Sequence, residues 1–100
     1  MQTSAVSKVW IDSEGRLHLA PSGCEFPYIY REAMEVHWDP STKSLFSPKP
    51  REWTYAQWFK QMLAAAREQG QILVFDRSTD WADIPAELKD QCLQAATGEA

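Results

Sequence analysis

The chain has 100 residues, of which 44% are hydrophobic and 24% charged, and its formal net charge is -4. This size and composition predict one globular domain with its own core, and argue against a disordered chain. The longest apolar run, Ile72 to Phe75, is much shorter than the roughly 20 residues that span a bilayer, and the first five residues lack signal-peptide features. A cytoplasmic protein without a membrane partner is therefore expected.

The acidic balance opposes attraction to phosphate backbones, so no nucleic-acid partner is predicted. The excess of acidic over basic residues is larger from Asp76 to the end of the chain. One basic stretch runs against it, with Lys43, Lys49 and Arg51.

Residues 7 to 20 predict a β-hairpin around a three-residue loop, with Gly15 at positive φ. In this register Asp12 pairs with Arg16, and Trp10 pairs with His18. The opposite face is apolar and carries Val9, Ile11, Leu17 and Leu19. Because a slip by one residue would mix the two faces, the pattern fixes the register.

Residues 28 to 39 alternate between apolar and polar side chains, which favours a strand. A short helix from Tyr30 to Val36 is the alternative, because Arg-Glu-Ala-Met-Glu favours helix locally. We prefer the strand because a turn signal at residues 39 to 42 leads into Ser44-Leu45-Phe46, which resembles a returning strand. Glu32 interrupts the aromatic face of this strand, where burial would suit it to acid-base chemistry.

Tyr55 to Gln69 predict an amphipathic helix with clear boundary signals. Thr54 and Gln57 form a capping box, Trp53 and Trp58 form a hydrophobic staple, and Gly70 is placed to end the helix. The apolar stripe consists of Tyr55, Trp58, Phe59, Met62, Leu63 and Ala66.

Gln71 to Phe75 lack alternation, which predicts a central strand buried on both faces. A polar loop follows, and a second helix is expected from near Pro85 through Ala95. The predicted order is β-β-β-β-α-β-α. This order predicts an α+β fold with a mostly antiparallel sheet of about five strands, packed against one long helix and a shorter C-terminal helix. Residues 1 to 100 form a single domain, with frayed tails at 1–5 and 97–100.

Four glycines are too few and too scattered for a P-loop or a dinucleotide motif, so no cofactor is predicted. A metal centre would need the fold to bring together His18, His37, Cys24 and a carboxylate. The loop after the last strand has three carboxylates that suit Mg²⁺ or Ca²⁺, but the end of a strand and the start of a helix explain them more simply. These carboxylates are Asp76, Asp80 and Asp83. No metal site is predicted, and Cys24 and Cys92 are expected to be buried free thiols.

The chain contains five tryptophans. The predicted helix explains Trp53 and Trp58, whereas Trp10 falls on a polar hairpin face and Trp81 in an acidic loop. Exposed tryptophans favour interfaces or ligand pockets, although covering the far side of a small sheet would also explain them.

The stretch from Trp53 to Leu88 contains the runs W-T-Y-A-Q-W-F, G-Q-I-L-V-F-D and D-I-P-A-E-L. These runs resemble small acidic orphan proteins carried on mobile gene cassettes of bacterial integrons. The stretch is also similar in general sequence character to toxin-immunity proteins. The first resemblance implies an α+β fold, frequent self-association and an unknown activity. The second implies an acidic surface that covers a basic toxin. Neither assigns a functional residue.

The leading hypothesis is a noncatalytic domain that binds a small molecule or a protein partner and forms a homodimer. Its predicted binding surface consists of Trp10, His18, Tyr28, Tyr30, Glu32 and Trp38. The first alternative is an immunity or antitoxin-like protein that inhibits a basic toxin. The second is a small enzyme that uses Glu32, His37 or Asp76, which requires these side chains to converge in one pocket.

Overall fold

The computed structural model describes residues 2 to 98, which form six strands, one short 3-10 helix and two α-helices. In chain order the elements are β1 (Gln2–Ile11), β2 (Leu17–Pro21), η1 (Ile29–Arg31), β3 (His37–Asp39), β4 (Ser44–Phe46), α1 (Tyr55–Glu68), β5 (Gln71–Val74), β6 (Asp80–Ala82) and α2 (Ala86–Gly98). Within this described part, neither helix is long and apolar enough to cross a membrane.

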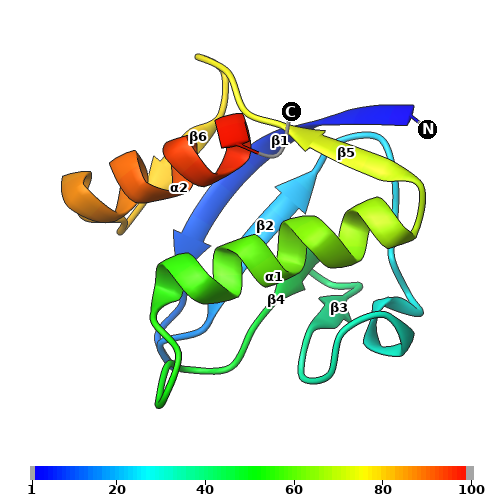
Figure 1. The fold of residues 1–100 in the computed structure, drawn as a ribbon, viewed down its shortest axis with the longest axis horizontal. Coiled ribbons are helices and arrows are strands. Elements are labelled where there is room, and N and C mark those ends of the chain that lie inside the picture. Colours follow the sequence, from blue (N-terminus) through cyan, green and yellow to red (C-terminus); the bar gives the residue numbers. More distant parts are fainter. Residues whose placement is uncertain (1, 99–100) are drawn as a thin grey trace.

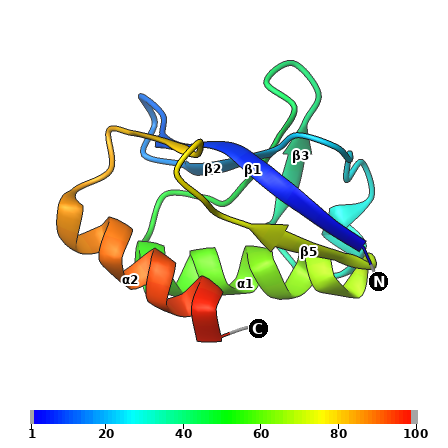
Figure 2. The same ribbon diagram turned by 90° about the horizontal axis from the view of Figure 1, so that it is seen from above.

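The strands form one mixed sheet in the order β3-β4-β2-β1-β5, and β6 also pairs with β1. The β1–β2, β2–β4 and β3–β4 pairs are antiparallel, whereas β5 and β6 run parallel to β1. Both helices lie on the same side of the sheet (Figures 1 and 2). We call the opposite side the outer face. The predicted α+β fold with a mostly antiparallel sheet is confirmed, with six strands where about five were expected.

The β1–β2 hairpin has the predicted register. Trp10 lies opposite His18, and the amide of Asp12 donates to the Arg16 carbonyl over 3.0 Å. Gly15 has φ of 81°. Glycine adopts this conformation readily, whereas other residues adopt it only at a cost in free energy. The inward side chains Val9, Leu17 and Leu19 are fully buried. The alternation of apolar and polar residues therefore determines both the pairing and the face that meets the helices.

The start of α1 also follows the prediction. The Gln57 amide donates to the Thr54 hydroxyl, and the Thr54 amide donates to the Gln57 side-chain oxygen, at 3.2 and 2.8 Å. The ring centroids of Trp53 and Trp58 are 4.8 Å apart, as a hydrophobic staple requires. The helix ends at Glu68, one residue before the expected end, and Gly70 follows with φ of 85°.

The segment before β3 is not the predicted strand. Only residues 37 to 39 are extended, and η1 occupies Ile29–Arg31. The buried side chains are Ile29, Ala33 and Val36, a spacing of four and then three residues that matches a helical rather than an alternating pattern. The alternative of a short helix was thus closer, although the turn begins one residue earlier. Tyr28, Tyr30 and Met34, assigned to one strand face, are all exposed.

Two further expectations about strands are wrong. β5 lies at one end of the strand order, and 39% of Val74 is exposed, so β5 is not a central strand buried on both faces. Part of the predicted polar loop forms β6, where Trp81 lies opposite Val9. Trp81 packs against Phe75 with ring centroids 5.9 Å apart, which explains this tryptophan without an exposed binding role.

Secondary structure extends into both predicted tails over the described residues. Gln2 to Ala5 pair in parallel with Gln71 to Val74, so the beginning of the chain is part of the sheet. At the other end, α2 extends through Gly98. Met1 and residues 99 and 100 lie outside the described residues.

The helix α2 begins at Ala86, directly after Pro85, and packs against α1 (Figure 2). Between Ala86 and Ala96, its buried side chains are Leu88 and Cys92. Burial raises the pKa of the Cys92 thiol to about 12, so this thiol stays protonated and acts as a packing group. Cys24 is only half-buried, and both cysteines are free.

Replacing Thr54 by alanine removes the acceptor for the Gln57 amide at the start of α1. We expect Thr54→Ala to lower the free energy of unfolding by about 1 kcal/mol, the usual contribution of an N-cap, in a urea melt. Thr54→Ser keeps a capping hydroxyl and serves as the control. Equal losses in the two variants would show that the cap does not support the helix.

Candidate functional site

The structure does not bring the six predicted binding residues together into one surface. Trp10 and His18 stack on the outer face, with ring centroids 4.6 Å apart and planes at 9°. Trp38 lies on the other side of the sheet, where its ring meets the edge of the Phe26 ring at 5.9 Å. Tyr28 and Tyr30, with centroids 6.5 Å apart, lie beside each other around η1. The predicted surface is therefore divided among three places.

The remaining predicted residue, Glu32, is exposed and not buried among aromatic rings. Its carboxylate accepts a hydrogen bond of 2.7 Å from the Gln69 side chain. The alternation that placed Glu32 on a buried face does not exist here, because a short 3-10 helix and further turns replace the strand. Without that burial, the reason for proposing Glu32 as an acid-base group is lost.

Four rings cross the outer face in one row, from Trp10 through His18 and Phe46 to His37. Neighbouring centroids are 4.6, 5.4 and 5.6 Å apart. Lys8 lies over the Trp10 ring at 5.2 Å, and Arg16 lies over the Phe46 ring at 5.0 Å. The faces of the rings contact one another and these cations. The row is therefore a packed layer and not an open platform for a flat ligand.

A chain of hydrogen bonds, buried at His18 and Ser44, runs from the second ring of this row. His18 Nε2 is 2.7 Å from Asp12 Oδ2, His18 Nδ1 is 2.8 Å from Ser44 Oγ, and Ser44 Oγ is 2.7 Å from Thr42 Oγ1. An Asp-His-Ser series can activate a serine nucleophile. Here, however, Ser44 is fully buried and only 2% of His18 is exposed, so no substrate reaches the hydroxyl. The chain instead joins the hairpin to β4.

Asp12 is the charged end of this chain. Burial alone would raise the pKa of its carboxyl, but hydrogen bonds from the Arg16 amide, the His18 ring and the Arg16 guanidinium outweigh burial and hold this pKa well below its usual range. The guanidinium bond, from Arg16 Nε to Asp12 Oδ2, is 2.8 Å long. Asp12 is therefore an ionised carboxylate that holds both strands of the hairpin.

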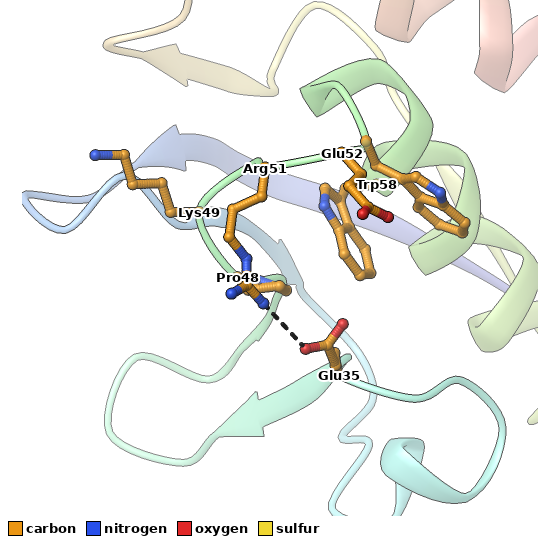
Figure 3. Close-up of a pocket in the computed structure, with 7 residues that line it drawn as sticks. Glu35, Pro48, Lys49, Arg51, Glu52 and Trp58 are labelled. Carbon is orange, nitrogen blue, oxygen red and sulfur yellow. Dashed lines mark ion pairs between the residues drawn. The ribbon is translucent and has the colours of Figure 1, made fainter.

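A pocket lies elsewhere, before the start of α1. It has a volume of about 380 Å³ and brings together the segment that precedes α1, the first turn of α1 and the loop that leads into β3 (Figure 3). We call it the Trp53 pocket. It is lined by Glu35, Pro48, Lys49, Arg51, Glu52, Trp53 and Trp58.

The two tryptophans form the apolar wall of the pocket. Trp58 is largely buried on α1, whereas 42% of Trp53 remains exposed. Their rings are 4.8 Å apart and inclined at 49°, which leaves no space for a ligand between them. The staple that begins α1 thus holds the Trp53 ring still while part of it remains open to the pocket.

The polar wall carries two cations and two carboxylates. Arg51 Nη2 is 3.9 Å from Glu35 Oε1, and both side chains are largely exposed, so this ion pair is loose. Arg51 extends toward Glu35, while the head of Lys49 points away from them (Figure 3). Glu35 has φ of 69°, in the left-handed region that side chains other than glycine, asparagine and aspartate rarely adopt.

The lining has no cysteine, serine or histidine, so it offers neither an obvious nucleophile nor an imidazole base. Across residues 2 to 98, no three His, Cys, Asp or Glu side chains are grouped to hold a metal ion. His18, His37 and Cys24, considered above for a metal centre, are not such a group. Asp76 accepts hydrogen bonds from the backbone and side chain of Ser78, which fits the simpler interpretation of a turn at the end of a strand.

Sequence reasoning assigned Trp53 and Trp58 to the helix and excluded them from function. One signal was available, because Trp53 precedes the helix and directly follows the charged residues Lys49, Arg51 and Glu52. Glu35 could not be connected with them from sequence, because its position depends on the turn before β3.

Comparisons with known proteins agree on one relationship. Residues 4–79 match the model of the family described as Integron Cassette Protein Hfx_Cass5. A solved structure of an integron cassette protein Hfx_Cass5, from the mobile metagenome of North West Arm Sewage Outfall, is 52% identical. The match covers 97% of this chain and 98% of that chain, with a TM-score of 0.50. No curated protein matches the chain.

The lowered pKa of Asp12 has a consequence for stability against acid. The folded state binds this proton less readily than the unfolded state, so Asp12 stabilises the fold above about pH 4 and this contribution is lost as the pH falls further. We expect the stability of the wild type, measured by urea melts, to decrease more steeply below pH 4 than that of Asp12→Asn.

Glu14→Gln is the matched control, because Glu14 also pairs with Arg16 but is exposed. Its acid profile should follow the wild type. Parallel profiles for the wild type and Asp12→Asn would contradict the assignment of Asp12 as the ionised end of the buried chain.

Proposed function

The chain belongs to the Hfx_Cass5 family of integron cassette proteins, and from its own surface we propose that it is a noncatalytic domain that binds a small molecule in the Trp53 pocket. The family name specifies no activity. The proposal rests mainly on one observation: a partly exposed tryptophan is fixed by a helix staple at the wall of a pocket.

The size and lining of this pocket support binding of a small molecule. Its volume of about 380 Å³ lies within the range of roughly 300 to 1,000 Å³ that is usual for ligand sites. Such sites combine apolar walls with a few polar groups that orient the ligand, and here the walls are Pro48 and the two indoles. A ring of the ligand would gain most by lying on the exposed part of Trp53.

The fixed position of Trp53 supports affinity as well. A side chain that becomes ordered only on binding reduces affinity by its lost freedom. Trp53 is already held against Trp58, and the capping box at Thr54 fixes the backbone beside it. Little further ordering is therefore needed on this wall when a ligand arrives.

We expect Trp53→Leu to weaken the binding of indole, used as a neutral flat probe, by roughly three- to tenfold, the usual effect of losing one aromatic contact. Leucine keeps an apolar contact with Trp58 and so preserves the staple. Saturation transfer from the protein to indole provides the measurement.

Tyr28→Ala is the control, because it removes an exposed aromatic side chain that does not line the pocket. Its indole binding should match the wild type. Undetectable binding of indole to the wild type, or equal losses in the two variants, would contradict the proposed site.

Self-association through a second surface is also part of the proposal. Tyr28, Tyr30 and Met34 expose 55%, 52% and 84% of their surface within one short segment. A cluster of large apolar side chains in water favours a protein interface.

We expect Met34→Glu to lower the mass measured by light scattering from that of a dimer toward that of a monomer. A wild-type chain that is monomeric at all concentrations would contradict this part.

A further inference from the structure

We infer that the Trp53 pocket selects a free α-amino acid with an aromatic side chain, whose carboxylate binds Arg51 and whose ammonium group binds Glu35. This inference rests on the proposed function, since it specifies the ligand of the same pocket. It is carried by the juxtaposition of an opposite-charge pair with a fixed indole.

The Arg51–Glu35 pair has the spacing that such a ligand requires. An α-amino acid carries its two opposite charges on groups attached to the same carbon atom, so its binding partners must also lie close together. Arg51 Nη2 and Glu35 Oε1 are 3.9 Å apart. This distance is beyond a good hydrogen bond, so each group keeps its capacity to bind a ligand of opposite charge.

The balance of charge also favours a ligand that carries both signs. Arg51 and Glu35 face each other on the lining, one charge of each sign, whereas the head of Lys49 points away from them (Figure 3). A ligand with only a carboxylate would leave Glu35 facing a like charge, and a ligand with only an ammonium group would do the same to Arg51. A zwitterion satisfies both partners at once, which limits the cost of removing these charges from water.

The apolar wall determines the kind of side chain. Trp53 and Pro48 line the same pocket as the charged pair. An aromatic side chain attached next to the two charged groups can therefore lie against Trp53 while the charges meet Arg51 and Glu35. An offset contact of two rings adds to the apolar area that is buried.

The backbone at Glu35 has the left-handed conformation, as it does at Lys43 and Asp83 outside the pocket. A glutamate at φ of 69° is unfavourable by itself and must be held by its surroundings. Such conformations occur often where a side chain is held ready for a ligand. Here the conformation places the Glu35 carboxylate on the pocket, opposite Arg51 (Figure 3).

The test compares four probes that share one ring and differ in which of the two charges is blocked: phenylalanine, N-acetylphenylalanine, phenylalanine amide and N-acetylphenylalanine amide. Binding is measured by NMR titration, with the wild type, Arg51→Gln and Glu35→Gln. We expect the wild type to bind phenylalanine about three- to tenfold more tightly than either singly blocked probe, because the charged pair is exposed and each contact is modest. The doubly blocked probe should bind most weakly.

The variants should remove one preference each. In Glu35→Gln, phenylalanine and N-acetylphenylalanine should bind alike, while phenylalanine amide remains weaker. In Arg51→Gln, phenylalanine and its amide should bind alike, while the N-acetyl probe remains weaker. Arg77→Gln, which changes an exposed arginine outside the pocket, should behave as the wild type.

Two results would overturn the inference in distinguishable ways. If the four probes bind the wild type equally and Trp53→Leu weakens the binding of all four, the pocket binds aromatic rings without distinguishing the charges attached to them. The inference then fails while the proposed function stands. If neither these probes nor indole bind, the proposed function fails and the inference with it.

Discussion

The Trp53–Trp58 contact at the start of α1 is the interaction on which both the fold and the pocket depend. It fixes where the long helix begins, and α1 supplies the buried Phe59, Met62 and Ala66 to the core beneath the sheet. The same contact holds the Trp53 ring at the pocket wall. Tyr55, the first residue of α1, extends this connection by donating from its hydroxyl to the Gly15 carbonyl over 2.9 Å. The hairpin turn, the helix and the pocket are thereby joined at one end of the molecule.

Features that depend on neighbouring residues could be predicted from the sequence. The hairpin register follows from alternation around Gly15, and the start of α1 follows from Thr54 and Gln57, because each signal lies within a few residues of the structure that it determines. Segments with mixed signals could not be assigned in this way. Tyr28 and Tyr30 suggested a strand face, but burial of Ile29, Ala33 and Val36 decided the structure of that segment. Tertiary packing there outweighs the local pattern.

The candidate site was missed for a related reason. Its charged pair joins Arg51 to Glu35, which are 16 positions apart, and no local pattern reveals that approach. The buried partner of His18 was equally hidden, because Ser44 reaches it only when β4 pairs with β2. The sequence accounts for Trp53 and Trp58 through the helix alone, which leaves no reason to assign them to a site. In this protein one side chain serves both purposes, since one part of Trp53 contacts the helix and another lines the pocket.

The position of β1 sets a condition on how the chain acquires its structure. β1 contains the first described residues, and it pairs with β5 and β6, whose sequence ends at Ala82. During synthesis on a ribosome, the hairpin and α1 can form from what has already emerged, whereas the second edge of β1 stays unpaired until residues 71 to 82 have also emerged. Contacts between such distant segments slow folding, because a long loop must close before the pairing stabilises it. Until then β1 presents an unpaired edge, and the nascent chain is most exposed to aggregation during that interval.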